Sequence, residues 1–170
     1  IGTQSMFKRE RIAELVAGLS FSAVANHDLS GLIMFSDIPE RYLPPRKGRN
    51  NALEILREVL YLQPKSNKTS LSAALLYAHK MLKKRCILFV ISDWIDKGYE
   101  QPLKILAQKH DVVALQVLDK CELELPNAGI LKLQDPETGE ELWVNSSDPK
   151  LRKAYREQID KQQAELQSFF

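Results

Sequence analysis

The sequence contains few cysteines, no excess of one charge sign and no long apolar run. Its two cysteines, Cys86 and Cys121, show no disulfide-framework spacing, so we expect a reducing, cytoplasmic setting. The 24 basic and 22 acidic residues leave a net charge of +2, which argues against a nucleic-acid binder that works through bulk electrostatics. No apolar run approaches the roughly 18 to 20 residues of a membrane span, and the amino terminus carries no signal-peptide pattern.

Signatures of several common chemistries are also missing. The histidines His27, His79 and His110 have no partner at i+4 and no nearby cysteine, so the clustered ligands that zinc needs are not there. The chain contains neither G-x-x-x-x-G-K-[ST] nor G-x-G-x-x-G, and nucleotide binding through those loops is not supported. No catalytic triad, nucleophile or general base can be assigned.

The overall amino-acid composition is that of a globular protein. With 170 residues, 44% of them hydrophobic, we expect a single domain over residues 1–170 that buries about two thirds of its unfolded surface. The chain begins with Ile1 and not with methionine, so we expect it to be a piece of a longer protein.

The most informative stretch is an apolar run that stops at a polar pair. Residues 86–91 are all apolar, which predicts a strand covered on both faces at the centre of a parallel sheet. Ser92 and Asp93 follow at its carboxyl end, between two helical patterns. Ligands of open α/β sheets bind at that edge, so Asp93 is the first candidate for a functional role.

The remaining periodicities predict alternating helices and strands. Strands 29–35 and 41–43 should pair antiparallel because the link of about five residues is too short for a parallel crossover, and residues 44–49 should form a basic loop. The helix–strand order around strands 86–91 and 112–118 predicts a parallel α/β sheet. Residues 130–133 and 142–144 should form a hairpin around a turn at 135–140. Helices are expected over 7–26, from a cap at Asn50 or Asn51 to Pro64, from a cap at Thr69 or Ser70 to Leu82, over 99–109, and from Asp148 to about Ser168.

Two pairs of polar residues are candidates for chemistry. Thr69 and Asp93 supply a hydroxyl and a carboxylate, hard oxygen donors that suit magnesium or manganese, if the loop carrying Thr69 folds beside Asp93. The alternative is a helix cap plus an unrelated strand-end aspartate. Asp93 and Asp96 could be the carboxylate pair of a hydrolase, or acids that cap the next helix.

A basic loop is the third candidate. Arg46, Lys47 and Arg49 cluster around Gly48 and could hold a phosphate or the acidic surface of a partner protein. A solvated turn is the alternative.

Six blocks of the sequence resemble the bacterial family called domain of unknown function 58. They are G-T-Q-S-M-F-K at 2–8, L-I-M-F-S-D at 32–37, P-P-R-K-G-R at 44–49, K-T-S-L at 68–71, V-I-S-D at 90–93 and D-P-E-T-G at 135–139. The resemblance implies a fold like the von Willebrand factor type A domain. That fold is a doubly wound, mostly parallel sheet with helices on both faces and a metal-ion-dependent adhesion site.

In that fold three loops hold the metal: a D-x-S-x-S motif, a threonine and an aspartate. Thr69 and Asp93 match the second and third ligands. The first motif, which the family carries just upstream of the block at residues 1–3, is absent here. The resemblance therefore implies a truncated chain that lacks the strand between strands 29–35 and 86–91, with an incomplete sheet and marginal stability.

The resemblance also implies a function. The chain would be a non-enzymatic interaction module in which bound Mg²⁺ or Mn²⁺ accepts an acidic residue of a protein partner. Family members are commonly encoded beside MoxR-type AAA+ ATPases, which makes such an ATPase or its client the expected partner. The charge and the lack of a long apolar run, noted above, predict no nucleic-acid partner and no membrane span. The alternatives are a magnesium-dependent hydrolase that uses Asp93 and Asp96, and a metal-independent scaffold.

Overall fold

A computed structural model describes residues 3–66, 68–118, 120–134 and 141–170, without the side chains of residues 3–7, 120, 121 and 134. The chain divides into two compact units, Ile1–Val117 and Leu118–Phe170, called here the first and second units. Whether residues 1–170 fold as one domain stays a prediction, because compactness does not test cooperative folding. No helix of the described residues combines the length and apolar character needed to cross a membrane.

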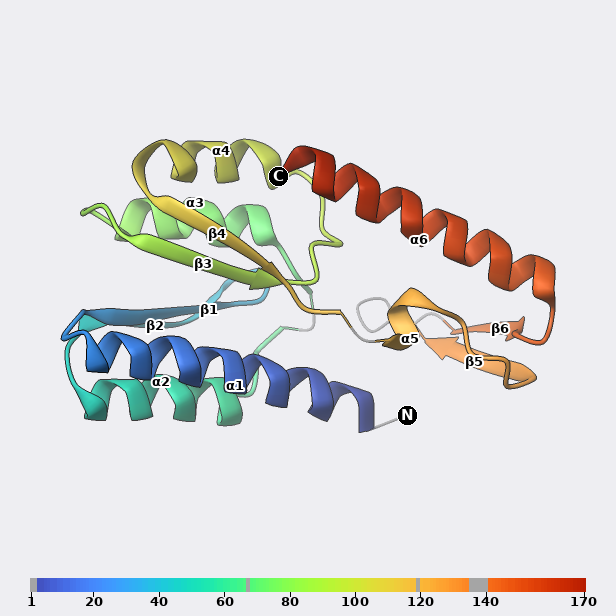
Figure 1. Ribbon diagram of the computed structural model, residues 1–170, viewed down its shortest axis with the longest axis horizontal. Helices are drawn as coiled ribbons and strands as arrows, with labels where there is room; N and C mark the ends of the chain where they lie inside the picture. The colour runs from blue at the N-terminus through green and yellow to red at the C-terminus, as the bar shows by residue number, and fades with distance from the viewer. Residues whose placement is uncertain (1–2, 67, 119, 135–140) are drawn as a thin grey trace. The chain divides into compact units, whose positions relative to one another are not determined.

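The first unit is an α/β arrangement with helices on both sides of its strands. Figure 1 shows α1 and α2 on one side of the strands and α3 and α4 on the other. The mixed α/β class expected from the sequence is therefore confirmed. The elements are α1 (Thr3–Ala25), β1 (Ser30–Phe35), β2 (Pro39–Arg46), α2 (Arg49–Tyr61), α3 (Leu71–Met81), β3 (Ile87–Ser92), α4 (Glu100–Lys109) and β4 (Asp111–Gln116).

The described strands of this unit form two separate pairs and not one continuous sheet. β1 pairs antiparallel with β2, as predicted from the short link between them, and β3 pairs in parallel with β4. Strands β1 and β3 are not hydrogen-bonded to each other, so a mostly parallel sheet does not form within the described residues. The family resemblance implied an incomplete sheet, and the missing strand that it placed between β1 and β3 stays a prediction.

One hydrophobic cluster holds the two strand pairs together. Its buried residues come from α1, β2 and α2, and they include Val16, Leu43 and Ile55. Ile55 is 1% exposed, and burying such a side chain contributes about 1.5 to 3 kcal/mol. Leu32 of β1 and Ile91 of β3 both pack against this cluster, so each strand pair contributes to the same core.

The expectation that strand 86–91 is central and covered on both faces is wrong for the described residues. Within β3, Val90 is buried, whereas the side chains of Ile87 and Phe89 are 61% and 39% exposed. Alternate residues of a strand point to opposite faces, so one face of β3 is buried and the other is partly open. Among the described strands it pairs with β4 alone, so it is an edge strand of that pair.

The second strand is longer than predicted. β2 continues through Pro44 and Pro45 to Arg46, residues that the sequence assigned to a loop. Prolines are tolerated there because β2 is an edge strand whose outer N–H groups need no partner. Gly31 of β1 lets the strands approach closely, since a Cβ atom there would lie 2.9 Å from the Leu43 carbonyl oxygen.

Of the two expected helix caps, the one at Asn50 or Asn51 is wrong and the one at Thr69 or Ser70 is confirmed at Ser70. α2 begins after Gly48, with no side-chain cap, so neither Asn50 nor Asn51 caps it. Asn51 lies within the helix, 6% exposed, and its side-chain amide donates to the carbonyl oxygens of Ser30 (2.8 Å) and Arg46 (3.2 Å). The cap of α3 is Ser70, whose hydroxyl accepts from the Ala73 N–H.

The second unit consists of a hairpin between two helices. Its elements are α5 (Lys120–Leu123), β5 (Ile130–Gln134), β6 (Glu141–Asn145) and α6 (Pro149–Phe169). The predicted hairpin is confirmed by the antiparallel pairing of Leu131 with Val144; its turn at 135–140, with the D-P-E-T-G block, lies outside the described residues. Asp148 caps α6 by accepting from the Lys150 N–H at 2.8 Å, as predicted. Cys121 lies in α5, and its side chain is outside the description.

Candidate functional site

Three loops of the first unit meet at the end where β1 and β3 finish, called here the carboxyl edge. The Ser70 N–H donates to the Ser36 carbonyl oxygen at 3.1 Å, which joins the loop before α3 to the loop after β1. The Leu71 N–H donates to Asp96 at 2.6 Å, which joins the same loop to the loop after β3. Thr69 and Asp93 are thus carried by two loops that a hydrogen bond connects directly.

Asp96 connects these loops through its carboxylate. One oxygen accepts from the Leu71 N–H at the start of α3, and the other accepts from the Lys97 N–H at 2.7 Å. A carboxylate at a helix N-terminus is stabilised by the unpaired N–H groups and the helix dipole. Asp96 therefore adds a second acceptor to the Ser70 cap at the start of α3. The interpretation that this acid caps the following helix is wrong, because α4 begins after Tyr99 without a side-chain cap.

Asp93 is more open to solvent. Its side chain is 39% exposed, and one carboxylate oxygen lies 3.6 Å from the Lys8 ammonium. The other oxygen accepts from the Ile95 N–H at 3.3 Å. The loop backbone therefore orients a carboxylate that remains accessible, and an amine from α1 supplies its counter-charge.

Trp94 holds this loop in an unusual conformation. Its φ of 62° lies in the left-handed region, which costs a non-glycine residue about 1 to 3 kcal/mol. The side chain is 5% exposed, its indole N–H donates to the Leu115 carbonyl oxygen at 3.2 Å, and its ring meets Tyr99 edge to face. These contacts fix the turn that presents Asp93. Sequence reasoning assigned no role to Trp94.

A buried hydroxyl organises the loop after β1. Ser36 is 6% exposed, and its hydroxyl donates to a carboxylate oxygen of Glu40 at 2.8 Å. That carboxylate also accepts from the Lys65 N–H at 2.9 Å, and the Ser36 hydrogen bond is the main reason that the pKa of Glu40 lies below its usual value. Sequence reasoning missed this network. Its signal is the pair Ser36-Asp37 directly after β1, which repeats the Ser92-Asp93 pair at the end of β3.

Thr69 is the second candidate ligand, and its hydroxyl is not used as a helix cap. The residue is exposed, and Ser70 beside it serves as the cap of α3. A hydroxyl and a carboxylate are donors of the kind that Mg²⁺ and Mn²⁺ accept. Among the described residues, no group of three or more His, Cys, Asp or Glu side chains could hold a metal ion. Thr69 and Asp93 therefore have the chemistry of magnesium ligands, but they are fewer than a complete site needs.

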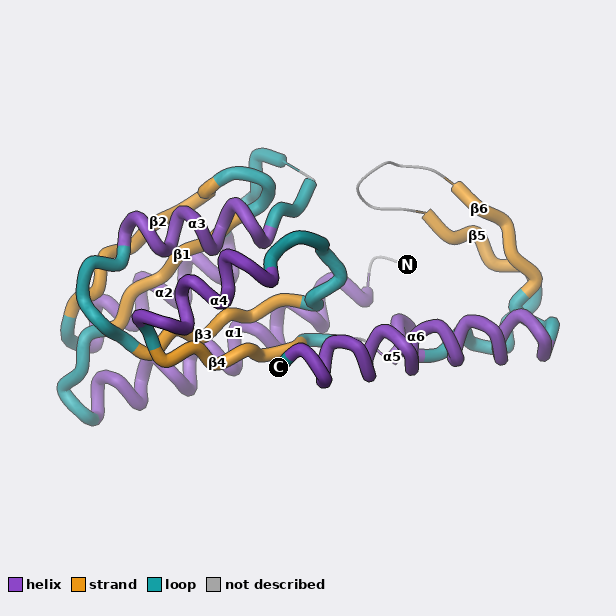
Figure 2. Tube along the Cα trace, turned by 90° about the horizontal axis from the view of Figure 1, so that it is seen from above, coloured by secondary structure: helices purple, strands orange, loops and turns teal. Residues whose placement is uncertain are grey.

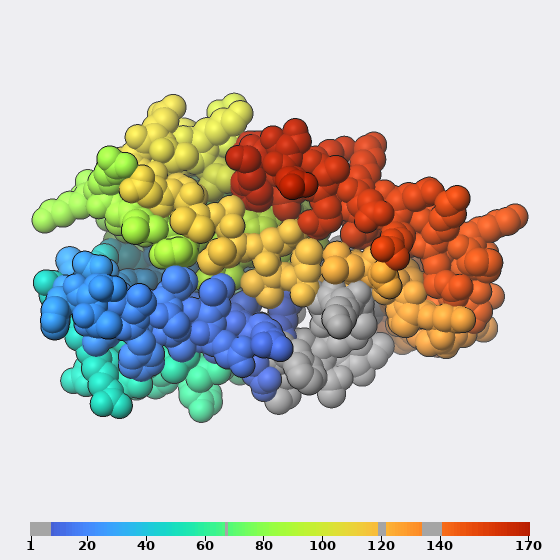
Figure 3. Space-filling view, in the orientation of Figure 1, coloured from blue at the N-terminus to red at the C-terminus, as the bar shows by residue number. Residues whose placement is uncertain are grey.

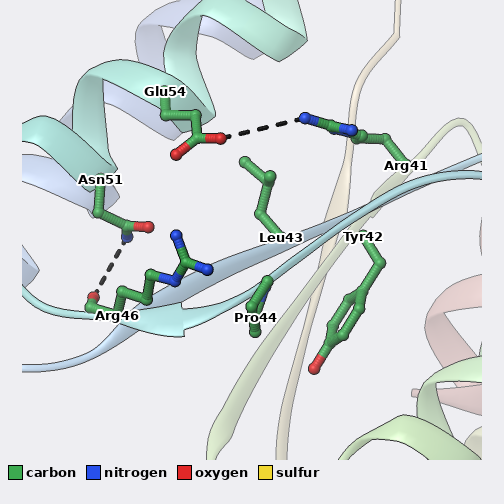
Figure 4. Close-up of a pocket in the computed structure, with 7 residues that line it drawn as sticks. All are labelled: Arg41, Tyr42, Leu43, Pro44, Arg46, Asn51 and Glu54. Atoms are coloured by element: carbon green, nitrogen blue, oxygen red, sulfur yellow. Dashed lines mark hydrogen bonds and ion pairs between the residues drawn. The ribbon is translucent and has the colours of Figure 1, made fainter.

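The basic candidates lie at the opposite end of the first unit. Arg46 pairs in register with Ser30, the first residue of β1, so Arg46, Lys47 and Arg49 are remote from Thr69 and Asp93. All three basic residues are exposed. Arg46 lines a shallow pocket of about 200 Å³ with Asn51 and Glu54, shown in Figure 4 with the Arg41–Glu54 ion pair.

A buried histidine and the first cysteine lie at that same end. His110 is 2% exposed, and its Nδ1 lies 3.3 Å from the Cys86 sulfur. Burial, followed by the nearby Lys109 and His79 charges, holds the pKa of His110 below its usual value. Burial also raises the pKa of the Cys86 thiol, so this thiol is not activated as a nucleophile.

Comparisons with known proteins identify relatives. The family model described as "Protein of unknown function DUF58" matches residues 1–165. Uncharacterized protein Mb1516 of Mycobacterium bovis and uncharacterized protein Rv1480 of Mycobacterium tuberculosis are each 28% identical over 154 residues, which is 89% of this chain and 48% of theirs. Uncharacterized protein MAV169 of Mycobacterium avium is 32% identical over 100 residues, 57% of this chain and 59% of its own. The chain thus spans about half the length of the curated relatives it matches. No solved structure matches it.

Proposed function

The chain belongs to the DUF58 family, and we propose that it is a non-enzymatic protein-interaction module with a metal-ion-dependent site at the carboxyl edge. Thr69 and Asp93 would hold Mg²⁺ or Mn²⁺ through hard oxygen donors, and the metal would accept a carboxylate from a partner protein. We further propose that the complete fold is the doubly wound sheet of the von Willebrand factor type A domain.

The observation that carries this proposal is the junction of the loops that bear the two donors. The Asp96 carboxylate accepts from the Leu71 N–H at 2.6 Å, which ties the residues after Thr69 to the residues after Asp93. Thr69 is not consumed as a helix cap, and Asp93 is partly exposed. Both donors are therefore accessible at one edge of the strands, where ligands of open α/β folds bind.

Lys8 has a defined role in this proposal. Its ammonium lies 3.6 Å from Asp93, so a divalent cation would share this carboxylate with Lys8 or displace its amine. Two protein donors satisfy only part of the octahedral shell of Mg²⁺, and water or further protein oxygens must supply the rest. In the family pattern those further oxygens belong to a D-x-S-x-S motif, which is not in this sequence.

The partner that we propose on the family resemblance is a MoxR-type AAA+ ATPase or its client, in protein assembly or maturation. A carboxylate on that partner would complete the metal's coordination. The magnesium-dependent hydrolase is the weaker alternative, because both oxygens of Asp96 already accept backbone N–H groups. A metal-independent scaffold remains the second alternative.

Calorimetric titration of the full-length protein with Mg²⁺ and with Mn²⁺ tests the metal site. We expect saturable binding that Asp93→Ala abolishes and Thr69→Ala weakens about tenfold or more, since each change removes one of few protein ligands. Asp28→Ala is the matched control, because it removes an exposed aspartate from the opposite end of the strands.

The alternatives give different results. Equal loss of binding in Asp28→Ala and Asp93→Ala would mean that the metal associates with surface charge and not with a site. Absence of binding in the full-length protein would leave the metal-independent scaffold. Phosphatase activity lost in both Asp93→Ala and Asp96→Ala would identify the hydrolase.

A further inference from the structure

The end of the first unit opposite the carboxyl edge carries a concentration of positive charge. This end, called here the amino edge, is where β1, β3 and β4 begin. Four connections between helices and strands lie at this end, at the left in Figure 1: residues 26–29, 47–48 and 82–86, and the single residue His110. Exposed basic residues within and beside these connections are Arg46, Lys47, Arg49, Lys80, Lys83, Lys84 and Arg85.

The fold gathers these charges from segments far apart in the sequence. Antiparallel pairing brings Arg46 beside Ser30 at the start of β1. α3 begins at the carboxyl edge, where its first N–H contacts Asp96, so its last turn with Lys80 reaches the amino edge. Figure 2 shows the connections that carry these residues at one end of the unit from the perpendicular direction, and the same end lies at the left in the space-filling view of Figure 3. A chain with a net charge of only +2 therefore has a strongly basic end.

Most of these charges are not used within the protein. Arg85 forms an ion pair with Asp111 at 2.8 Å. By contrast, six cations have neither an ion-pair nor a hydrogen-bond partner for their side chains in the part of the chain that is described: Arg46, Lys47, Arg49, Lys80, Lys83 and Lys84. Unpaired like charges on one surface repel each other, and an anionic partner relieves that repulsion.

We propose that the amino edge is a metal-independent docking surface for an acidic segment of a partner protein. Charge complementarity selects an anion, and two exposed aliphatic side chains at the same end favour a protein. Leu29 and Ile87 are 58% and 61% exposed, and they offer the apolar contact typical of protein interfaces.

The other anionic macromolecules fit this surface less well. The connections of the amino edge and the residues that flank them, 26–29, 46–50, 79–86 and 109–111, contain no Trp, Tyr or Phe. Aromatic side chains stack on the bases of single-stranded nucleic acids and anchor proteins at the membrane interface. An acidic protein segment needs neither contact.

Fluorescence anisotropy of a labelled decaglutamate peptide tests this surface. We expect the unaltered chain to bind in low salt with EDTA present, and to bind more weakly as ionic strength rises and screens the charges. The triple variant Lys80→Gln, Lys83→Gln, Lys84→Gln should bind at least about tenfold more weakly, since three of the docking charges are lost.

The matched control removes the same charge from the other end. Lys65→Gln, Lys68→Gln, Lys97→Gln alters three exposed lysines at the carboxyl edge and should change the affinity less than about twofold, because these charges lie far from the bound peptide. Circular dichroism melting of both variants verifies that each remains folded.

Four results would overturn the proposal. They are no binding of the peptide by the unaltered chain, equal loss in the two triple variants, a requirement for Mg²⁺, and tighter binding of phosphatidylserine vesicles or duplex DNA through the same lysines. A requirement for Mg²⁺ would assign the acidic segment to Thr69 and Asp93 instead. Failure here thus leaves the proposed metal site standing, and failure of the metal site leaves this surface unaffected.

Discussion

The carboxyl and amino edges of the first unit use charge in opposite ways. At the carboxyl edge the carboxylates are engaged: Asp96 with two backbone N–H groups, Glu40 with Ser36 and Lys65, and Asp93 with Lys8. At the amino edge a neutral amide, Asn51, makes the structural connections, while most of the cations remain without partners.

This difference separates charges that build structure from charges that are available for binding. A carboxylate held by backbone N–H groups fixes the conformation of a loop, and its removal should cost stability. An exposed lysine without a partner contributes nothing to the fold and slightly destabilises it through repulsion. Four predictions test the comparison, in order of decreasing effect.

The largest effect should come from the buried amide of the amino edge. Asn51→Ala leaves the Ser30 and Arg46 carbonyl oxygens without their donor, and we expect it to lower the free energy of unfolding by about 2 to 3 kcal/mol. Asn50→Ala is the control, because Asn50 is its exposed neighbour in the same helix. Urea unfolding measures both, and equal losses would show that Asn51 does not organise this edge.

The carboxylate that joins the loops of the carboxyl edge should have the next largest effect. Asp96→Ala removes the external cap of α3, and we expect it to lower the free energy of unfolding by about 1 to 2 kcal/mol. Asp93→Ala should cost less, about 0 to 1 kcal/mol, since its ion pair with Lys8 is partly exposed. The reverse order in chemical denaturation would contradict the assignment of Asp96 as the structural acid.

Acid should weaken the two edges in different pH ranges. The pKa of His110 is lowered from 6.5, so the unfolded state binds the proton more readily, and stability falls as pH drops below about 6.5. The pKa of Glu40 is lowered from 4.5, so its contribution is complete above about pH 4.5 and is lost below it.

Replacing His110 or Glu40 should remove the part of the pH dependence of stability that each residue causes. His110→Gln should flatten the decline in melting temperature just below pH 6.5, and Glu40→Gln the decline below pH 4.5. His27→Gln, at an exposed position, is the control and should leave both declines in place. A profile that no replacement changes would mean that other groups control acid sensitivity.

The smallest effect should come from the unpaired lysines. Lys83→Gln with Lys84→Gln removes two neighbours of Arg85, and we expect the free energy of unfolding to rise by about 0.2 to 0.5 kcal/mol in low salt. The gain should disappear at high ionic strength, where charge repulsion is screened. A loss of stability would show that these lysines have structural partners after all.

Much of the secondary structure could be predicted from the sequence because it depends on local patterns. The helix with Ala74 and Ala78 on its buried face, the antiparallel pairing of β1 with β2, and the Asp148-Pro149 start of α6 were all expected and are confirmed. These features depend on periodicity, on the length of a link and on cap chemistry, all of which lie within a few residues.

The errors concern features that depend on distant neighbours. The sequence did not show that Pro44 and Pro45 would continue an edge strand, or that Asn51 would lie inside α2 instead of capping it. It placed the apolar strand at the centre of a sheet, although β3 pairs with one strand among those the structure describes and exposes Ile87. An apolar run indicates how much apolar side-chain surface could be buried, whereas the packing of neighbouring elements determines how much of it is buried.

The sequence by itself determined the α/β class, most of the elements and the residue types available for chemistry, because backbone propensity, hydrophobic periodicity and side-chain chemistry belong to short segments. Only the tertiary structure decided which residues meet. It joined the loops of Thr69 and Asp93 through Asp96, and it collected cations from two separate connections at one end of a nearly neutral chain. Charge acts through space, and positions in space follow from strand pairing and helix packing rather than from order along the chain.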